Sequence, residues 1–229
     1  MSECELLRSV CRSVRDLRTS KLGPAALLVG LSGIDASGKG YLAERLRGNL
    51  EQIGLNVALV GVDGWLNLPR ARSSLVDPGL CFYEHGFRLD ELFAQLVLPL
   101  CANRSLNLEM DYAEQTAHKY RRHRYTFSRV DIVLLEGIFV FKRELRPHFD
   151  LACWIGCTFE TAMKRAIQPC QEGLTREETI HVYETIYWPA QHIHFQRDRP
   201  RESADLIINN DPPPAWSRNR ITKLEAERG

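Results

Sequence analysis

The chain has 229 residues, of which 44% are hydrophobic and 26% are charged, and its formal net charge is +1. This length suits one large α/β domain with a substantial core. The near-neutral charge gives no indication of a nucleic-acid or membrane-surface partner, and no run approaches the ~18 apolar residues of a membrane span. We expect a cytoplasmic protein with reduced thiols, because Met1 to Glu5 shows no signal-peptide pattern and the seven cysteines are scattered.

The N-terminal segment is predicted to form an amphipathic helix. Apolar residues recur at helical spacing from Leu6 to Leu17, with arginines mainly on the opposite face. We expect this helix to pack outside a sheet, and a partner-binding or membrane-surface helix is the alternative. We assign residues 1–24 to the helical segment, 25–211 to the main domain, and 212–229 to a tail that should be poorly ordered.

The most informative stretch begins at Leu27. An apolar run leads into a glycine-bounded loop ending in Lys39, and a helical pattern follows. This matches the phosphate-binding pattern G-x-x-x-x-G-K-[ST], except that Gly40 stands in the last position and removes a hydroxyl that usually helps to hold Mg²⁺. Loop amides and the helix N-terminus hold phosphate, and the lysine adds a mobile positive charge. We expect the nucleotide phosphates to be bound by one continuous run: Gly33, Ile34, Asp35, Ala36, Ser37, Gly38, Lys39, Gly40 and Tyr41.

The rest of the chain alternates strands with helices. We predict strands over residues 56–62, 130–137, 151–156 and 204–208, helices over 40–53, 89–101 and 158–168, and a β-hairpin over 104–127. Residues 66–88 should be irregular. Thr175 should cap a further helix in a capping box with Glu178, and that helix should stop or kink near Trp188-Pro189.

This alternation predicts an α/β fold, a P-loop NTPase-type parallel sheet with helices on both faces and a projecting β-hairpin. Ligands of such sheets bind beyond the carboxyl ends of the strands. Lys39, Asp63 and Glu136 belong to the carboxyl ends of three different predicted strands, so we expect them in one crevice. No guanine-reading N-K-x-D motif and no ABC-type signature is present, which favours a small-molecule kinase among P-loop proteins.

The sequence resembles the uridine kinase/phosphoribulokinase branch of P-loop kinases, especially bacterial uridine kinase-like proteins. The resemblance is carried by four stretches: the loop 33–39, Val62-Asp63-Gly64, residues 131–139 and residues 204–210. It implies ATP and Mg²⁺ as cofactors and transfer of the γ-phosphate to a hydroxyl, with a nucleoside such as uridine as the leading acceptor. It also implies that related chains often assemble into homo-oligomers through the hairpin and the outer helices.

The resemblance assigns roles to two acidic residues. Asp63 matches the residue that accepts the proton of the attacking hydroxyl and also stands near the metal and the substrate. An aspartate of a tight turn is the alternative, since Asp-Gly is a common turn pair. Glu136 matches the acidic residue that orients Mg²⁺ and its waters, and a buried structural carboxylate is the alternative.

Substrate contacts and a lid segment are also implied. Asp111, Tyr112 and His118 match the region that holds the nucleoside, although hairpin surface residues would look similar. Arg165 is the catalytic candidate of the lid, and Arg176 is a candidate substrate contact. The lid departs from the family pattern, because residues 168–173 lack the expected arginines.

Other functions fit the same residues. The acceptor could be a sugar phosphate or a pantothenate-like alcohol within the same branch. Gly40 and the arginine-poor lid would also suit a nucleotide-binding regulator with little turnover. A partner-binding module built on helix 3–20 is a third interpretation. In the first two cases the expected partners are ATP and a small molecule, without nucleic acid or membrane.

Overall fold

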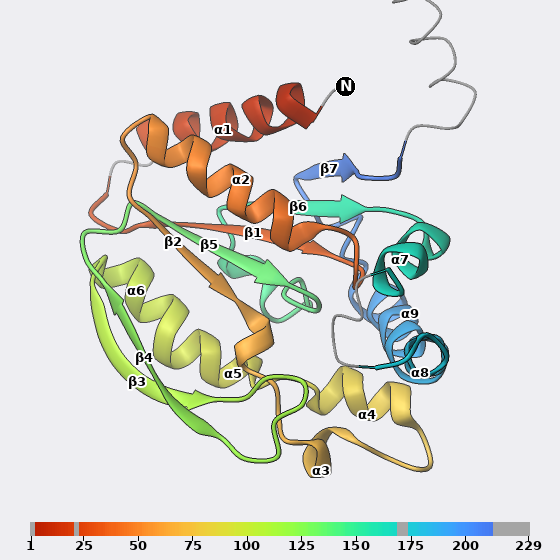
Figure 1. Ribbon diagram of the computed structural model, residues 1–229. Coiled ribbons are helices and arrows are strands. Elements are labelled where there is room, and N and C mark those ends of the chain that lie inside the picture. The colour runs from red at the N-terminus through yellow and green to blue at the C-terminus, as the bar shows by residue number, and fades with distance from the viewer. Residues whose placement is uncertain (1–2, 21–22, 169–173, 213–229) are drawn as a thin grey trace, which may run out of the picture.

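Five short apolar runs form one parallel sheet, as the sequence predicts. Figure 1 shows the computed structural model, which describes residues 3–20, 23–168 and 174–212, with side chains from Leu7 onward. The strands lie in the order β2-β5-β1-β6-β7. Their bounds are Leu27–Gly33 (β1), Val57–Gly61 (β2), Ile132–Gly137 (β5), Leu151–Gly156 (β6) and Leu206–Asn209 (β7). Because all five run the same way, their carboxyl ends form one edge of the sheet (Figure 1).

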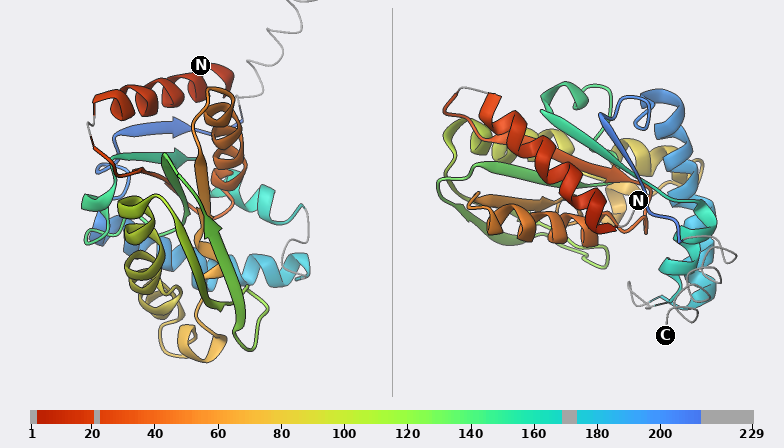
Figure 2. Two further views of the ribbon diagram at one scale, coloured as in Figure 1. Left: turned by 90° about the vertical axis from the view of Figure 1, so that its left-hand side faces the viewer. Right: turned by 90° about the horizontal axis from the view of Figure 1, so that it is seen from above.

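Helices cover both faces of this sheet. On one face lie α1 (Glu3–Ser20) and α2 (Lys39–Gln52), which Figure 2 shows side by side. Val10 and Val14 of α1 share a buried cluster with Leu46 of α2 and with the strands, so the N-terminal helix uses its apolar face for packing. The remaining helices are grouped around the other face and the carboxyl edge: α3 (Pro69–Arg72), α4 (Pro78–His85), α5 (Leu89–Leu92), α6 (Leu98–Asn103), α7 (Phe159–Ala166), α8 (Arg176–Val182) and α9 (Trp188–Asp198).

The segment between β2 and α5 is more regular than predicted. The expectation of an irregular stretch over 66–88 is wrong for α4, a helix of two turns. Asp77 caps it by accepting a hydrogen bond from the Leu80 amide at 2.9 Å, and Pro78 occupies the first helical position. The pair Asp77-Pro78 is a helix-start signal that can be recognised from the sequence alone. The helix is stabilised mainly by burial of Phe82 and Tyr83, which the sequence pattern does not reveal.

The predicted hairpin is present. Strands β3 (Leu106–Tyr112) and β4 (Arg121–Phe127) pair antiparallel as a two-stranded sheet separate from the main one (Figure 1). Met110 is buried, and apolar side chains of both strands pack against the main core. The hairpin is therefore anchored on one face, while Glu109, Asp111, Arg122 and Arg124 occupy the other.

Two long helices each contain a proline. Helices α5 and α6 are joined by the π-helical turn Phe93–Val97, and α8 and α9 by the π-helical turn Tyr183–Tyr187. Pro99 and Pro189 each follow one of these turns by two residues. Of the predicted stop or kink near Trp188-Pro189, the stop is wrong, because the wider turn accommodates the missing amide without ending the helix. The predicted capping box of Thr175 and Glu178 at the start of α8 is confirmed.

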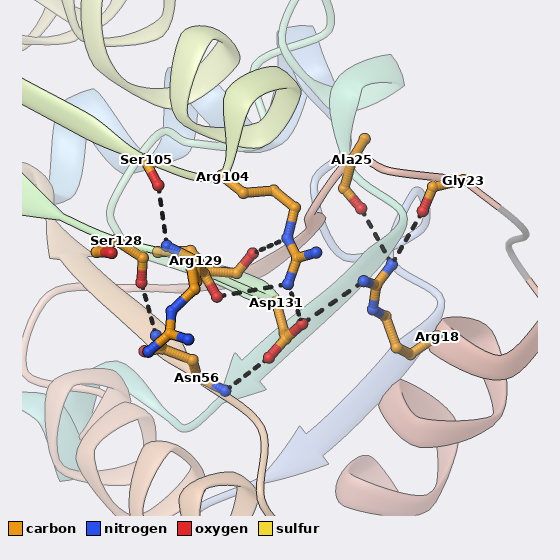
Figure 3. Close-up of polar contacts among 10 residues, drawn as sticks. Arg18, Gly23, Ala25, Asn56, Arg104, Ser105, Ser128, Arg129 and Asp131 are labelled. Atoms are coloured by element: carbon orange, nitrogen blue, oxygen red, sulfur yellow. Dashed lines mark hydrogen bonds and ion pairs between the residues drawn. The ribbon is translucent and has the colours of Figure 1, made fainter.

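At the amino edge of the sheet, Asp131 joins three segments of the chain (Figure 3). Its carboxylate accepts hydrogen bonds from Arg104 Nη2 at 2.5 Å and from the Asn56 amide at 2.9 Å, and it lies 3.5 Å from Arg18 Nη2. Arg18 also donates to the Ala25 carbonyl at 3.1 Å. The end of α1 and the start of the hairpin are thus attached at the edge opposite the carboxyl ends.

Two expectations cannot be compared with the structure. Most of the lid residues, 169–173, and most of the tail, 213–229, lie outside the described residues. Within the part of the chain that is described, no helix has the length and apolar composition needed to span a membrane.

Candidate active site

The loop between β1 and α2 has the backbone of a phosphate cradle. Ala36 and Gly38 adopt positive φ angles of 54° and 87°, and α2 begins at the next residue, Lys39. The first amides of a helix have no partner within it, so here they are available for an anion. Glycine is favoured at position 38 for two reasons. Its φ angle is positive, and a Cβ at this position would lie 2.5 Å from Asn210 Nδ2.

The outer side of the loop is held by two donors. Arg165 Nη1 and Asn210 Nδ2 both donate to the Ser37 carbonyl, at 3.0 and 2.7 Å. Arg165 Nη2 also donates to the Asn210 carbonyl at 2.6 Å. The structure therefore places Arg165 against the loop backbone. Arg176 is exposed on the first turn of α8, which extends away from the sheet in Figure 2.

Lys39 is surrounded by carboxylates. Its side chain is 10% exposed, and its Nζ lies 3.9 Å from Asp35 Oδ1. Burial lowers the pKa of this amine, but the charges of Asp35, Glu136 and Asp63 raise it further than burial lowers it. The lysine is therefore charged at neutral pH, and the crevice predicted from three strand ends is present.

Glu136 faces the position of the missing loop hydroxyl. Burial is the main cause that raises the pKa of Glu136, from 4.5 to about 7; Lys39 opposes the rise, and Asp63 and Asp35 add to it. A Cβ at Gly40 would lie 3.9 Å from Glu136 Oε2. Among the described residues, no three His, Cys, Asp or Glu side chains are grouped to hold a metal alone. Mg²⁺ commonly keeps waters and phosphate oxygens beside one or two carboxylates, so this donor set fits a nucleotide-bound ion.

A cavity of about 370 Å³ opens beside this crevice, within the ~300–1,000 Å³ typical of small-molecule sites. Its apolar walls are Leu66, Phe82, Phe87 and Ile138, and its polar groups belong to Asp35, Asp63, Glu114, Gln115, Tyr183 and Tyr187. None of the described residues that line it is a lysine, arginine or histidine.

Asp63 joins the cavity to the phosphate loop. It lies in the 3₁₀ turn Val62–Gly64 that directly follows β2. Its carboxylate is reached by solvent through the open cavity, yet protein surrounds most of it, and this partial desolvation raises its pKa; the Lys39 charge opposes the rise. Within the described residues, the carboxylate accepts no hydrogen bond and forms no close ion pair, although the Lys39 charge acts on it.

None of the three predicted hairpin contacts lines this cavity. Asp111 pairs with Arg122 at 2.9 Å, the Tyr112 ring packs against Gly64, and His118 lines a separate recess. Alternation along a strand and the path of the hairpin loop decide which side chains face inward, and in this hairpin Glu114 and Gln115 do so. Sequence reasoning missed these two residues, as well as Tyr183 and Tyr187 from the π-helical turn.

Two further cavities lie nearby. One, of about 480 Å³, adjoins the phosphate loop and the ends of β6 and β7, and Ile34, Phe159 and Asp211 are among its lining residues. A larger one, about 810 Å³, lies between α4 and the end of α9. No phosphate-loop residue and none of the crevice carboxylates lines this larger cavity, so its size does not identify it as the reaction site.

No family model matches this sequence, and no curated protein is similar enough in sequence to match it. Solved structures do match. A possible uridine kinase from Bacillus stearothermophilus has a TM-score of 0.71 and 20% identity, covering 91% of this chain and 100% of that chain. A candidate fructose transport system kinase from Silicibacter sp. TM1040 has a TM-score of 0.64 and 19% identity, covering 90% and 98%.

A D-glycerate 3-kinase from Cryptococcus neoformans has a TM-score of 0.61 and 14% identity, covering 89% of this chain and 95% of that chain. At these identities the likeness establishes the fold. It is the α/β fold of P-loop kinases, in agreement with the resemblance to the uridine kinase/phosphoribulokinase branch.

Proposed function

We propose that this chain is an ATP-dependent kinase that transfers the γ-phosphate to a hydroxyl of a small uncharged acceptor, with a nucleoside such as uridine as the leading candidate. The observation that carries the proposal is the position of Asp63. An unpaired carboxylate stands where the acceptor cavity meets the phosphate loop and its lysine. A general base for a hydroxyl nucleophile needs this location.

The nucleotide would be held by the loop from Gly33 to Tyr41, with Lys39 charged against the phosphates. The recess beside Ile34 and Phe159 offers an apolar site for the base. Mg²⁺ would be held by Glu136 and Asp63 together with phosphate and water oxygens, and it supplies charge neutralisation at the phosphates. Arg165 supports the loop from its carbonyl side, and Arg176 remains a candidate contact to the substrates.

The reaction requires one proton transfer. The acceptor hydroxyl donates a hydrogen bond to Asp63, which takes the proton as the hydroxyl oxygen bonds to the γ-phosphorus. The bond from the γ-phosphorus to the bridging oxygen breaks, and ADP leaves with that electron pair. The raised pKa of Asp63 suits this role, because a base works best when its pKa approaches the working pH.

The charges of the cavity favour an uncharged acceptor. Asp35 and Asp63 face the cavity, and none of its described lining residues is cationic; Glu114 also lines it but pairs with Arg121 at 3.0 Å. Two like charges 4 Å apart repel by about 1 kcal/mol in water and about 4 kcal/mol near a protein surface. A sugar phosphate or a pantothenate-like carboxylate would meet this repulsion, whereas a nucleoside would place its base against Phe82 and Phe87.

The test is ADP release with matched acceptors. We expect turnover with uridine or another nucleoside, and much less with a sugar phosphate or pantothenate. Asp63→Asn should lower kcat by about 10²–10⁴-fold while ATP binding persists. Asp16→Asn, an exposed change on α1, is the control. Unchanged turnover in Asp63→Asn, or a preference for anionic acceptors, would overturn the proposal.

Gly40 supports a second candidate, a nucleotide-binding regulator with little turnover. The loop lacks the hydroxyl that usually helps to hold Mg²⁺. This candidate predicts that an ATP analogue binds but that no acceptor of the panel releases ADP, even in Gly40→Ser. Turnover with any acceptor would exclude it.

A further inference from the structure

Asp35 has an unusual position for a phosphate-loop residue. Its backbone belongs to the loop, but its side chain lines the acceptor cavity together with Asp63. A carboxylate in a loop that binds phosphates is electrostatically unfavourable, because it repels the same anion that the loop amides attract. This unfavourable energy suggests that the Asp35 side chain binds the acceptor rather than the nucleotide.

The Asp35 carboxylate is held by the helix that forms the far wall of the cavity. Tyr183 donates its hydroxyl hydrogen to Asp35 Oδ2. Asp35 Oδ1 lies 3.9 Å from Lys39 Nζ, beyond hydrogen-bond distance. An ionised carboxylate offers about four lone-pair sites, so Asp35 can still accept from a ligand in the cavity. Its side chain is 29% exposed.

The donor to Asp35 is rigidly placed. Tyr183 is 6% exposed and opens the π-helical turn that Tyr187 closes, and the two rings pack edge to face with centroids 5.2 Å apart. Tyr187 in turn accepts a hydrogen bond from Gln115 Nε2 at 2.6 Å. π-helical turns within longer helices often occur at functional sites, and this one directs two phenols into the cavity.

We propose that Asp35, positioned by Tyr183, binds a second hydroxyl of the acceptor while Asp63 binds the hydroxyl that is phosphorylated. This inference rests on the proposed kinase function. Two carboxylates in one cavity can each accept a hydrogen bond from a ligand, and a diol supplies both donors from one molecule. The substrate class is therefore an uncharged polyol, such as a ribonucleoside with its 2′ and 3′ hydroxyls.

The experiment compares uridine, 2′-deoxyuridine and 3′-deoxyuridine in the full chain with ATP and Mg²⁺. For the wild-type protein, removing the hydroxyl that reaches Asp35 should lower kcat/KM by about 10–100-fold, as expected for a hydrogen bond to a charged group. In Asp35→Asn the three compounds should differ by less than about 3-fold, with KM for ATP unchanged or lowered. An Asp35 that only shapes the loop would instead raise KM for ATP and leave the selectivity intact.

Tyr183→Phe tests the positioning role. It should reduce the preference for uridine about 3–10-fold through KM, while kcat with uridine stays within about 3-fold. Tyr120→Phe removes a phenol that bonds Asn67 at 3.2 Å outside the cavity, and it is the matched control. Equal turnover of all three nucleosides by the wild-type protein would overturn the inference.

A binding measurement separates this inference from the kinase proposal. Calorimetry with the same three compounds and a non-hydrolysable ATP analogue detects the second hydroxyl without turnover. Selective binding without ADP release would refute the kinase proposal and support the role of Asp35. Turnover of all three compounds without selectivity would support the kinase proposal and refute the role of Asp35. The absence of both binding and turnover would refute the two proposals together.

Discussion

Replacing Glu136 by glutamine should stabilise the protein in the absence of ligands, and the gain should depend on pH. The folded state raises the pKa of this carboxyl from 4.5 to about 7, because burial and the charges of Asp63 and Asp35 outweigh Lys39. The folded chain therefore holds this proton more tightly than the unfolded chain. The contribution of Glu136 to the free energy of unfolding is therefore full below pH 4.5, decreases as the pH rises toward 7, and is lost above pH 7.

The size of the effect follows from the same values. At about 1.4 kcal/mol for each pKa unit, the rise corresponds to about 3–4 kcal/mol of destabilisation once Glu136 is ionised in the folded state. Since the crevice is open to solvent, about 3–4 kcal/mol is an upper bound. Glu136→Gln should therefore gain about 2–3 kcal/mol at pH 8 and less than about 1 kcal/mol at pH 5.

Urea unfolding between pH 5 and 8, without nucleotide or Mg²⁺, measures this gain. Asp16→Asn is the control, because its exposed ion pair with Arg15 on α1 should contribute less than about 1 kcal/mol at any pH. A gain that is the same at pH 5 and pH 8 would show that packing, not ionisation, is responsible. A loss at pH 8 would refute the electrostatic reasoning.

Three further changes have defined outcomes. Gly40→Ser would add an oxygen beside Glu136 and should lower the Mg²⁺ concentration for half-maximal ADP release about 10-fold, so an unchanged requirement would mean the hydroxyl does not reach the ion. Asp131→Ala should lower the free energy of unfolding in urea by about 2–4 kcal/mol but leave kcat/KM unchanged, because its contacts lie at the amino edge of the sheet. Asp198→Asn should cost about 1–3 kcal/mol in the same assay, since Tyr83 and His194 both bond its carboxylate at 2.6 Å, and no loss would show that the amide replaces both bonds.

Features that depend on neighbouring residues were predictable. The loop from Gly33 to Lys39 and the capping box of Thr175 are set by spacings of a few residues, and both are present. The gathering of Asp63 and Glu136 beside Lys39 was also predictable, because parallel strands bring their carboxyl ends to one edge.

Features that depend on packing between residues far apart in the sequence were not predictable. Tyr183 meets Asp35 across 148 positions of sequence, and no local pattern marks that tyrosine as a cavity residue. Glu114 and Gln115 face the cavity because of the hairpin's path, which composition does not encode. Pro189 has a strong local tendency to end a helix, yet packing favours a π-helical turn that lets the helix continue.

The order of the strands has an evolutionary consequence. Most of the acceptor cavity wall comes from residues 62–131, the segment between β2 and β5, and these two strands are neighbours in the sheet. The segment leaves the sheet at its carboxyl edge and returns at its amino edge, and both of its ends are fixed on the same rigid pair of strands. Such a segment can be shortened, lengthened or exchanged as a cassette while the phosphate loop on the adjacent β1 stays intact. A lineage could in this way acquire new acceptors, provided that Asp63 at the start of the segment is kept.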